Sequence, residues 1–121
     1  MSDRKKTVLI VDDDEGMREH LTLMLRRDYR VLRAATGEAG LLMMEKEHVD
    51  LMLLDVDLPF IDGHSVLEAL NEKGLQVPTI FISGLPGEEP EVRAFDIGAA
   101  DFIRKPVKNS VLLARVAKVL K

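Results

Sequence analysis

Short apolar runs alternate with amphipathic segments five times along the chain, and this alternation limits the fold more than any other feature. The runs are TVLIV (7–11), YRVLRAA (29–35), DLMLL (50–54), TIFIS (79–83) and ADFIR (100–104). The first, third and fourth are apolar at consecutive positions, which is typical of parallel strands buried on both faces. The second run carries two arginines and the fifth is short, so we predict that these two strands lie nearer the edges of the sheet.

The segments between the runs have the apolar spacing of amphipathic helices. The residues expected on the buried faces are Met17, Leu21, Met24 and Leu25; Ala39, Leu42 and Met43; Val66, Leu67 and Leu70; and Leu112, Leu113, Val116, Val119 and Leu120. Gly74 and Gly98 are expected to follow the third and fourth helices, and Pro90 to lie in the first turn of the fourth. Asn109 is the expected N-cap of the fifth.

Five β–α repeats imply right-handed crossovers, which predicts an α/β fold. The expected architecture is a doubly wound three-layer sandwich, with a five-stranded parallel sheet and five helices. Because no linker or low-complexity tract interrupts the pattern, residues 1–121 are expected to form a single domain.

Composition excludes several classes of function. The 46% hydrophobic and 31% charged residues indicate a globular protein, and the net charge of −4 argues against nucleic acid as a direct partner. The absence of cysteine excludes disulfides and thiolate metal sites. The N-terminal apolar run is too short for a signal peptide, and no run approaches the roughly 18 apolar residues of a membrane span. We therefore expect a cytoplasmic protein with no membrane contact.

Polar residues stand where the central strands end. Asp12 and Asp13 follow the first strand, Asp55 the third, Ser83 the fourth, and Lys105 the fifth. Ligands of open α/β sheets bind at the carboxyl ends of the strands, so these side chains are expected to meet in one cleft.

Three carboxylates in one cleft favour a bound cation, and oxygen ligands select a hard one such as Mg²⁺. A carboxylate beside Mg²⁺ is suited to attack phosphorus, while a lysine and a hydroxyl are suited to hold phosphoryl oxygens. Each residue alone has a plainer interpretation as a helix cap, a turn residue or a solvated charge. Asp14 and Glu15 are assigned to that plainer role at a helix start. The joint placement at successive strand ends favours the metal and phosphoryl site for the others.

Four segments resemble the receiver domain of two-component response regulators. They are VLIVDDDEGMREHL, VDLMLLDVDLPFIDG, VPTIFISG and GAADFIRKP, and the resemblance runs from about Thr7 to the end of the chain. It implies the flavodoxin-like fold of the chemotaxis regulator and a phosphorylation-controlled switch. Such a domain catalyses only its own phosphorylation and dephosphorylation, and its output surface is formed by helix 4, strand 5 and helix 5.

The resemblance implies a role for each site residue. Asp55 would accept the phosphoryl group from a sensor histidine kinase. Asp13 would bind Mg²⁺ directly and Asp12 mostly through water, and the backbone carbonyl of Asp57 would be a further ligand. These roles make Mg²⁺ the expected cofactor.

The remaining roles concern the response to phosphorylation. Ser83 and Lys105 would bind the phosphoryl oxygens, and Phe102 would take the place of the family's rotating aromatic residue. The Lys105–Pro106 peptide bond would be cis, a state open to X–Pro bonds.

Two residues depart from the commonest family pattern: Asp57, two residues after the acceptor, and Leu85, two residues after Ser83. Both bear on the lifetime of the phosphate. The last helix also resembles that of receivers attached to winged-helix transcription factors. In those proteins an acid and an arginine pair across a dimer, and Asp101 and Arg115 stand at these positions. A homodimer on activation is therefore expected.

Two other functions are compatible with parts of the sequence. DVDLP resembles the Asp-x-Asp motif of haloacid-dehalogenase-like phosphatases, with Asp55 as nucleophile and Asp57 as general acid. Pro59 and the upstream position of the other acids argue against that enzyme. The other possibility is an interaction module that is never phosphorylated. The sequence identifies neither the kinase nor the effector domain or target protein.

Overall fold

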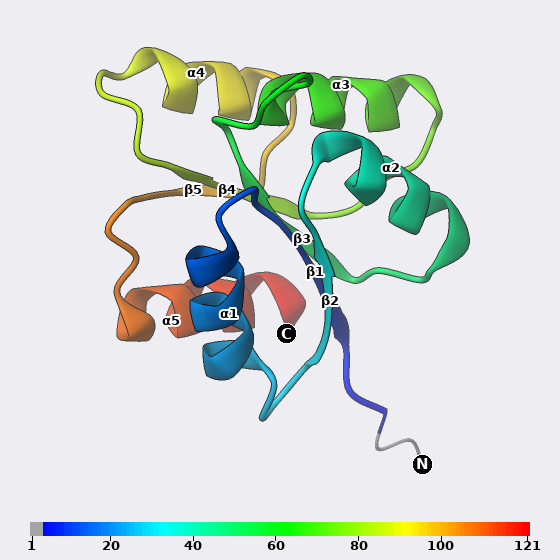
Figure 1. The fold of residues 1–121 in the computed structure, drawn as a ribbon, viewed down its shortest axis with the longest axis vertical. Coiled ribbons are helices and arrows are strands. Elements are labelled where there is room, and N and C mark those ends of the chain that lie inside the picture. The colour runs from blue at the N-terminus through cyan, green and yellow to red at the C-terminus, as the bar shows by residue number, and fades with distance from the viewer. Residues whose placement is uncertain (1–3) are drawn as a thin grey trace.

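The computed structural model describes residues 4–121, which form five strands and five helices in strict alternation (Figure 1). In chain order the elements are β1 Thr7–Val11, α1 Glu15–Leu25, β2 Arg30–Ala34, α2 Gly37–Lys46, β3 Leu51–Asp55, α3 Gly63–Glu72, β4 Thr79–Ser83, α4 Glu89–Asp96, β5 Asp101–Arg104 and α5 Asn109–Leu120. The predicted α/β fold with five parallel strands and five helices is confirmed.

The strands form one parallel sheet in the order β2-β1-β3-β4-β5. Every residue of β1, β3 and β4 is buried, whereas β2 and β5 have exposed positions. The prediction that the second and fifth strands lie at the edges is confirmed. The carboxyl ends of the central strands therefore lie side by side in the middle of the sheet, where ligands of such folds bind.

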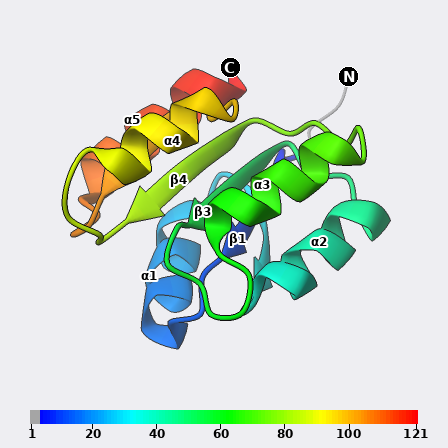
Figure 2. The ribbon, with the colours of Figure 1, turned by 90° about the horizontal axis from the view of Figure 1, so that it is seen from above.

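Helices cover both faces of the sheet. Helices α2, α3 and α4 lie on one face and α1 and α5 on the other, as Figures 1 and 2 show from two directions. Alternate strand residues point into separate cores: Leu9 and Val11 join the core under α2, α3 and α4, while Val8 and Ile10 join the core under α1 and α5. The consecutive apolar residues of β1 thus serve two cores at once.

Most predicted helix boundaries agree with the structure. Pro90 lies in the first turn of α4, and Gly74 and Gly98 follow α3 and α4 with φ of 73° and 102°. The prediction that Asn109 caps α5 is wrong. Lys108 has an extended backbone and occupies the N-cap position, so Asn109 is already the first helical residue.

Two residues expected on buried helix faces are exposed. Leu42 is 54% exposed because α2 packs through Gly40 and Met44; a Cβ on Gly40 would lie 2.9 Å from Cγ2 of Val11. This close approach of helix to strand turns Leu42 outwards. Leu113 is exposed as well, since α5 buries Leu112, Val116 and Leu120 at intervals of four.

The two ends of the described chain meet beside the amino ends of the strands, opposite the carboxyl ends that carry the site residues. Nζ of Lys6, just before β1, donates a hydrogen bond of 2.9 Å to the carbonyl of Leu120 at the end of α5. Within residues 4–121, none of the helices has the length and apolar character needed to cross a membrane.

Candidate functional site

Four predicted site residues meet where neighbouring strands end. Asp12 follows β1, Asp55 ends β3, Ser83 ends β4 and Lys105 follows β5. Nζ of Lys105 lies 3.5 Å from Oδ2 of Asp55 and 3.7 Å from Oδ2 of Asp12. One ammonium therefore faces two carboxylates from different strands.

The two carboxylates are oriented in the same way. Oδ1 of Asp12 accepts the N–H of Asp14 at 2.9 Å, and Oδ1 of Asp55 accepts the N–H of Asp57 at 3.2 Å. In each case the side chain accepts the N–H of the residue two positions later in the sequence. Aspartate commonly makes this bond where a strand or helix ends. With Oδ1 held by the backbone, Oδ2 of each carboxylate is the oxygen that faces Lys105.

Burial dominates the electrostatics of this pair. Asp12 and Asp55 are only 2% and 3% exposed. Burial, followed by the nearby Asp12 carboxylate, raises the pKa of Asp55 to about 6, although Lys105 and the Asp57 N–H oppose the shift. Burial also raises the pKa of Asp12, against the Asp14 N–H and Lys105. One lysine does not offset the cost of two buried anions.

Asp13 completes a group of acids that fits a metal ion. Asp12, Asp13 and Asp55 each offer one carboxylate oxygen, and these oxygens all lie within 4.8 Å of one another. Asp13 is exposed while the other two are buried, so the group opens to solvent on one side. Carboxylates that converge, repel one another and face water on one side are suited to a hard divalent cation.

Two neighbouring acids are outside this group. Asp14 is the N-cap of α1, and its Oδ1 accepts the N–H of Gly16 at 3.1 Å, the helix-start role predicted for it. The Asp57 side chain is exposed and lines a pocket between the segment after β3 and α4.

The residues assigned to the switch lie on β4 and β5. Oγ of Ser83 is buried and accepts the N–H of Leu85 at 3.0 Å. Phe102 is 6% exposed and packs into the core on the α2/α3/α4 side. The Lys105–Pro106 peptide bond is cis.

The two residues assigned to a dimer contact bind each other within the chain. Nη1 of Arg115 on α5 donates to Oδ1 of Asp101 on β5 at 2.9 Å. The same oxygen accepts the N–H of Phe102 at 2.8 Å. Any pairing of these charges between two copies has to replace this internal ion pair.

Sequence reasoning missed two polar residues around the site. Nη1 of Arg18 donates to the backbone carbonyl of Asp12 at 2.7 Å, so α1 holds the strand end that carries the acids. Its position four residues after the N-cap Asp14 places it beside the start of the helix, but this spacing does not identify the Asp12 carbonyl as its partner. His64 is buried, with its ring against Phe81 and Nε2 2.9 Å from the carbonyl of Pro90, and no pattern in the sequence indicated this contact.

The sequence matches the response regulator receiver domain over residues 8–117. Transcriptional regulatory protein AfsQ1 of Streptomyces coelicolor is 37% identical over 116 residues, which cover 95% of this chain and 51% of that protein. The chain spans about half the length of the curated relatives it matches. The family match leaves nothing in favour of the haloacid-dehalogenase-like alternative.

Solved structures agree with this match. A CheY-like response regulator receiver domain protein from Methanospirillum hungatei JF-1 superimposes with a TM-score of 0.90 at 32% identity, covering 96% of this chain and 94% of that one. The BeF3-activated DrrB receiver domain has a TM-score of 0.87 at 29% identity, covering 96% and 97%.

Proposed function

The chain belongs to the response regulator receiver domains, the phosphoryl-accepting switches of two-component systems, and we propose that Asp55 is the residue that accepts the phosphoryl group. One observation carries this assignment. Asp55 is the buried acid at the end of a central strand, and its Oδ2 faces Lys105. At neutral pH most of it is ionised, because its pKa is about 6.

The proposed reaction is a direct transfer. Oδ2 of Asp55 attacks the phosphorus of a phosphohistidine or an acyl phosphate. A bond from this oxygen to phosphorus forms as the bond from phosphorus to the donor breaks, and the donor leaves with the electron pair. Lys105 and Ser83 bind oxygens of the transferred group, so that its charge is compensated on the side away from the donor.

Receiver domains of this family bind Mg²⁺ at an acidic pocket, and the group of Asp12, Asp13 and Asp55 has the donors to hold it here. We propose these three residues and the backbone carbonyl of Asp57 as its site. When bound, Mg²⁺ supplies positive charge for the phosphoryl oxygens. The exposed Asp57 side chain adds to the negative field beside that site.

Response regulator receivers interact with histidine kinases and effector domains. The proposed donor for this chain is a sensor histidine kinase in the cytoplasm, where the ATP that charges such a kinase is made. The proposed output is a change in the surface of α4, β5 and α5, where Phe102 and Ser83 respond to the phosphoryl group. A homodimer through that surface would exchange the internal Asp101–Arg115 pair for one between copies.

Acetyl phosphate tests the acceptor. With Mg²⁺, intact-mass spectrometry should show one added phosphoryl group, and a chelator should abolish it. Asp55→Asn should remove the label, whereas Asp57→Asn should keep it, because that exposed acid is not the proposed nucleophile. Undiminished labelling of Asp55→Asn would disprove the assignment.

A further inference from the structure

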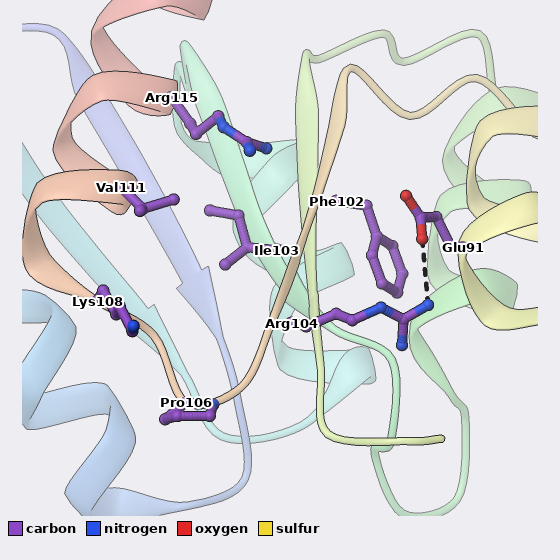
Figure 3. Close-up of a pocket in the computed structure, with 8 residues that line it drawn as sticks. All are labelled: Glu91, Phe102, Ile103, Arg104, Pro106, Lys108, Val111 and Arg115. Carbon is purple, nitrogen blue, oxygen red and sulfur yellow. Dashed lines mark hydrogen bonds and ion pairs between the residues drawn. The ribbon is translucent and has the colours of Figure 1, made fainter. Parts of the chain in front are cut away.

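Arg104, the last residue of β5, connects that strand to the segment between β4 and α4. Nη2 donates to the carbonyl of Gly87 at 2.8 Å and to Oε1 of Glu91 at 3.1 Å, and Nη1 donates to the carbonyl of Leu85 at 3.3 Å. Its guanidinium carbon lies 5.3 Å from the centroid of the Phe102 ring. Figure 3 shows this side chain reaching past Phe102 to Glu91. The guanidinium thus contacts the loop, the next helix and the aromatic ring together.

The loop depends on this side chain for its position. In the described part of the chain, residues 84–87 take part in no backbone-to-backbone hydrogen bond. The two donors of Arg104 instead bind the carbonyls of Leu85 and Gly87. A loop without a ladder of its own is easily displaced, so these bonds contribute much of its attachment to β5.

Leu85 links this attachment to the site. Its carbonyl accepts from Arg104, while its N–H donates to Oγ of Ser83 at 3.0 Å. Ser83 is therefore held by a residue that Arg104 holds in turn. If the Ser83 side chain turns towards a phosphoryl group on Asp55, Oγ has to leave the Leu85 N–H, or the loop has to move with it.

We propose that Arg104 is a positioning residue of the switch, which holds the loop and Ser83 in the unphosphorylated arrangement. This inference rests on the proposed function. Because the bonds from Arg104 stabilise the starting arrangement, removing them lowers the free energy needed to reposition Ser83. The phosphorylated arrangement then forms more readily.

Three variants separate the contacts of Arg104. Arg104→Met keeps an apolar stem beside Phe102 and removes every donor. Arg104→Lys keeps the charge but has no planar fork to span two carbonyls. Glu91→Gln removes the exposed ion pair alone and leaves the carbonyl contacts, and exposed ion pairs contribute little.

Affinity for beryllofluoride with Mg²⁺ measures the switch. Arg104→Met should bind it about three- to tenfold more tightly than the parent, since the two bonds to the Leu85 and Gly87 carbonyls that stabilise the starting state are lost. The affinity of Arg104→Lys should lie between those of the parent and Arg104→Met. The affinity of Glu91→Gln should stay within about twofold of that of the parent. Unchanged affinity in Arg104→Met overturns the inference.

A second background tests whether the effect passes through the Ser83 hydroxyl. In Ser83→Ala the bond to Leu85 is absent, so adding Arg104→Met should no longer raise the affinity. An equal increase in both backgrounds shows general loosening and overturns the proposed role.

Amide hydrogen exchange provides a measurement that does not require the proposed function. Without any ligand, Arg104→Met should accelerate exchange at the Leu85 amide about tenfold and leave amides of β1 unchanged. Unaltered exchange at Leu85 overturns the positioning role. If the parent itself binds no beryllofluoride, the proposed function fails, and the Leu85 exchange rate still decides whether Arg104 positions the loop.

Discussion

Nζ of Lys105 lies 3.5 Å from Oδ2 of Asp55, yet the pKa of Asp55 is raised to about 6. The lysine side chain keeps contact with solvent, whereas the carboxylate is almost fully buried beside that of Asp12. Desolvation and repulsion therefore outweigh this single attraction. Without a cation, the arrangement that favours Mg²⁺ binding reduces the stability of the fold.

Replacing the acceptor by a neutral isostere should stabilise the metal-free protein. We expect Asp55→Asn to raise the free energy of unfolding by about 1–3 kcal/mol in chelator at pH 7.5, since it removes a buried anion. A carboxyl whose pKa is raised in the folded state lowers the free energy of unfolding of the protein as the pH rises from about 4 to about 6. The gain should therefore vanish below about pH 4. Urea titrations of the parent and the variant measure the free energy of unfolding at both pH values. A loss of stability in Asp55→Asn at pH 7.5 would refute the electrostatic argument.

Two adjacent acids should differ in their effect on Mg²⁺. Asp13→Ala removes a member of the three-acid group and should weaken Mg²⁺ binding about tenfold or more. Asp14→Ala should leave the affinity nearly unchanged and cost about 1 kcal/mol of stability, because that side chain caps α1. Titration calorimetry compares them, and equal losses of affinity would show that the group of ligands is misassigned.

Asp50 should contribute stability that depends on pH. Its Oδ2 accepts the N–H of Thr7 at 2.8 Å, and this bond, helped by His48, holds the pKa of Asp50 below its usual value. A carboxylate with a lowered pKa stabilises the fold above about pH 4, and this contribution is lost as the pH falls through the folded-state pKa.

We therefore expect Asp50→Ala to lower the free energy of unfolding by about 1–2 kcal/mol at pH 7. The difference from the parent should shrink towards the lowest pH at which both remain folded. Asp50→Asn keeps an acceptor for Thr7 and should lose less at pH 7. A deficit in Asp50→Ala that is independent of pH would mean that packing, not charge, explains it.

Two glycines should respond in opposite ways to alanine. A Cβ on Gly63 would lie 2.3 Å from the carbonyl oxygen of Asp55 and 3.0 Å from Cα of Val56, so the backbone after the acceptor has to shift. Gly63→Ala should cost about 3 kcal/mol or more and reduce phosphorylation. A Cβ on Gly16, in the first turn of α1, would lie 3.6 Å from Oδ1 of Asp14, an ordinary contact distance, so Gly16→Ala should be neutral or stabilising by up to about 1 kcal/mol. Thermal unfolding distinguishes them, and similar effects would contradict the contact.

The central or edge position of each strand followed from the sequence, because burial on both faces leaves a consecutive apolar pattern in the central strands. The exposure of a helix side chain could not be predicted where it depends on how closely the helix approaches the sheet. Leu42 fits the helical stripe of α2, yet the contact of Gly40 with Val11 determines which side of α2 is buried. The cap of α5 depended on the extended backbone of Lys108, which residue type does not determine.

The site could be assembled from the sequence because parallel strands bring their ends to one edge. Asp12, Asp55 and Lys105 meet for that reason alone. The contacts of Arg18 and Arg104 with backbone carbonyls could not be predicted. A long flexible side chain has many rotamers, and a carbonyl acceptor is present at every residue, so sequence does not select the pair.

The hydrogen bond from Lys6 to Leu120 has a consequence for protein engineering. It brings the beginning of β1 beside the end of α5, away from the strand ends that carry the acids. A short flexible linker should therefore join the two ends, and a circular permutant could be opened in the segment between α3 and β4, where residues 73 and 74 are exposed. Such a chain would present Asp55 near its C-terminal end while keeping the same neighbouring strands, so the reaction centre depends on adjacency in the sheet and not on the order of the polypeptide.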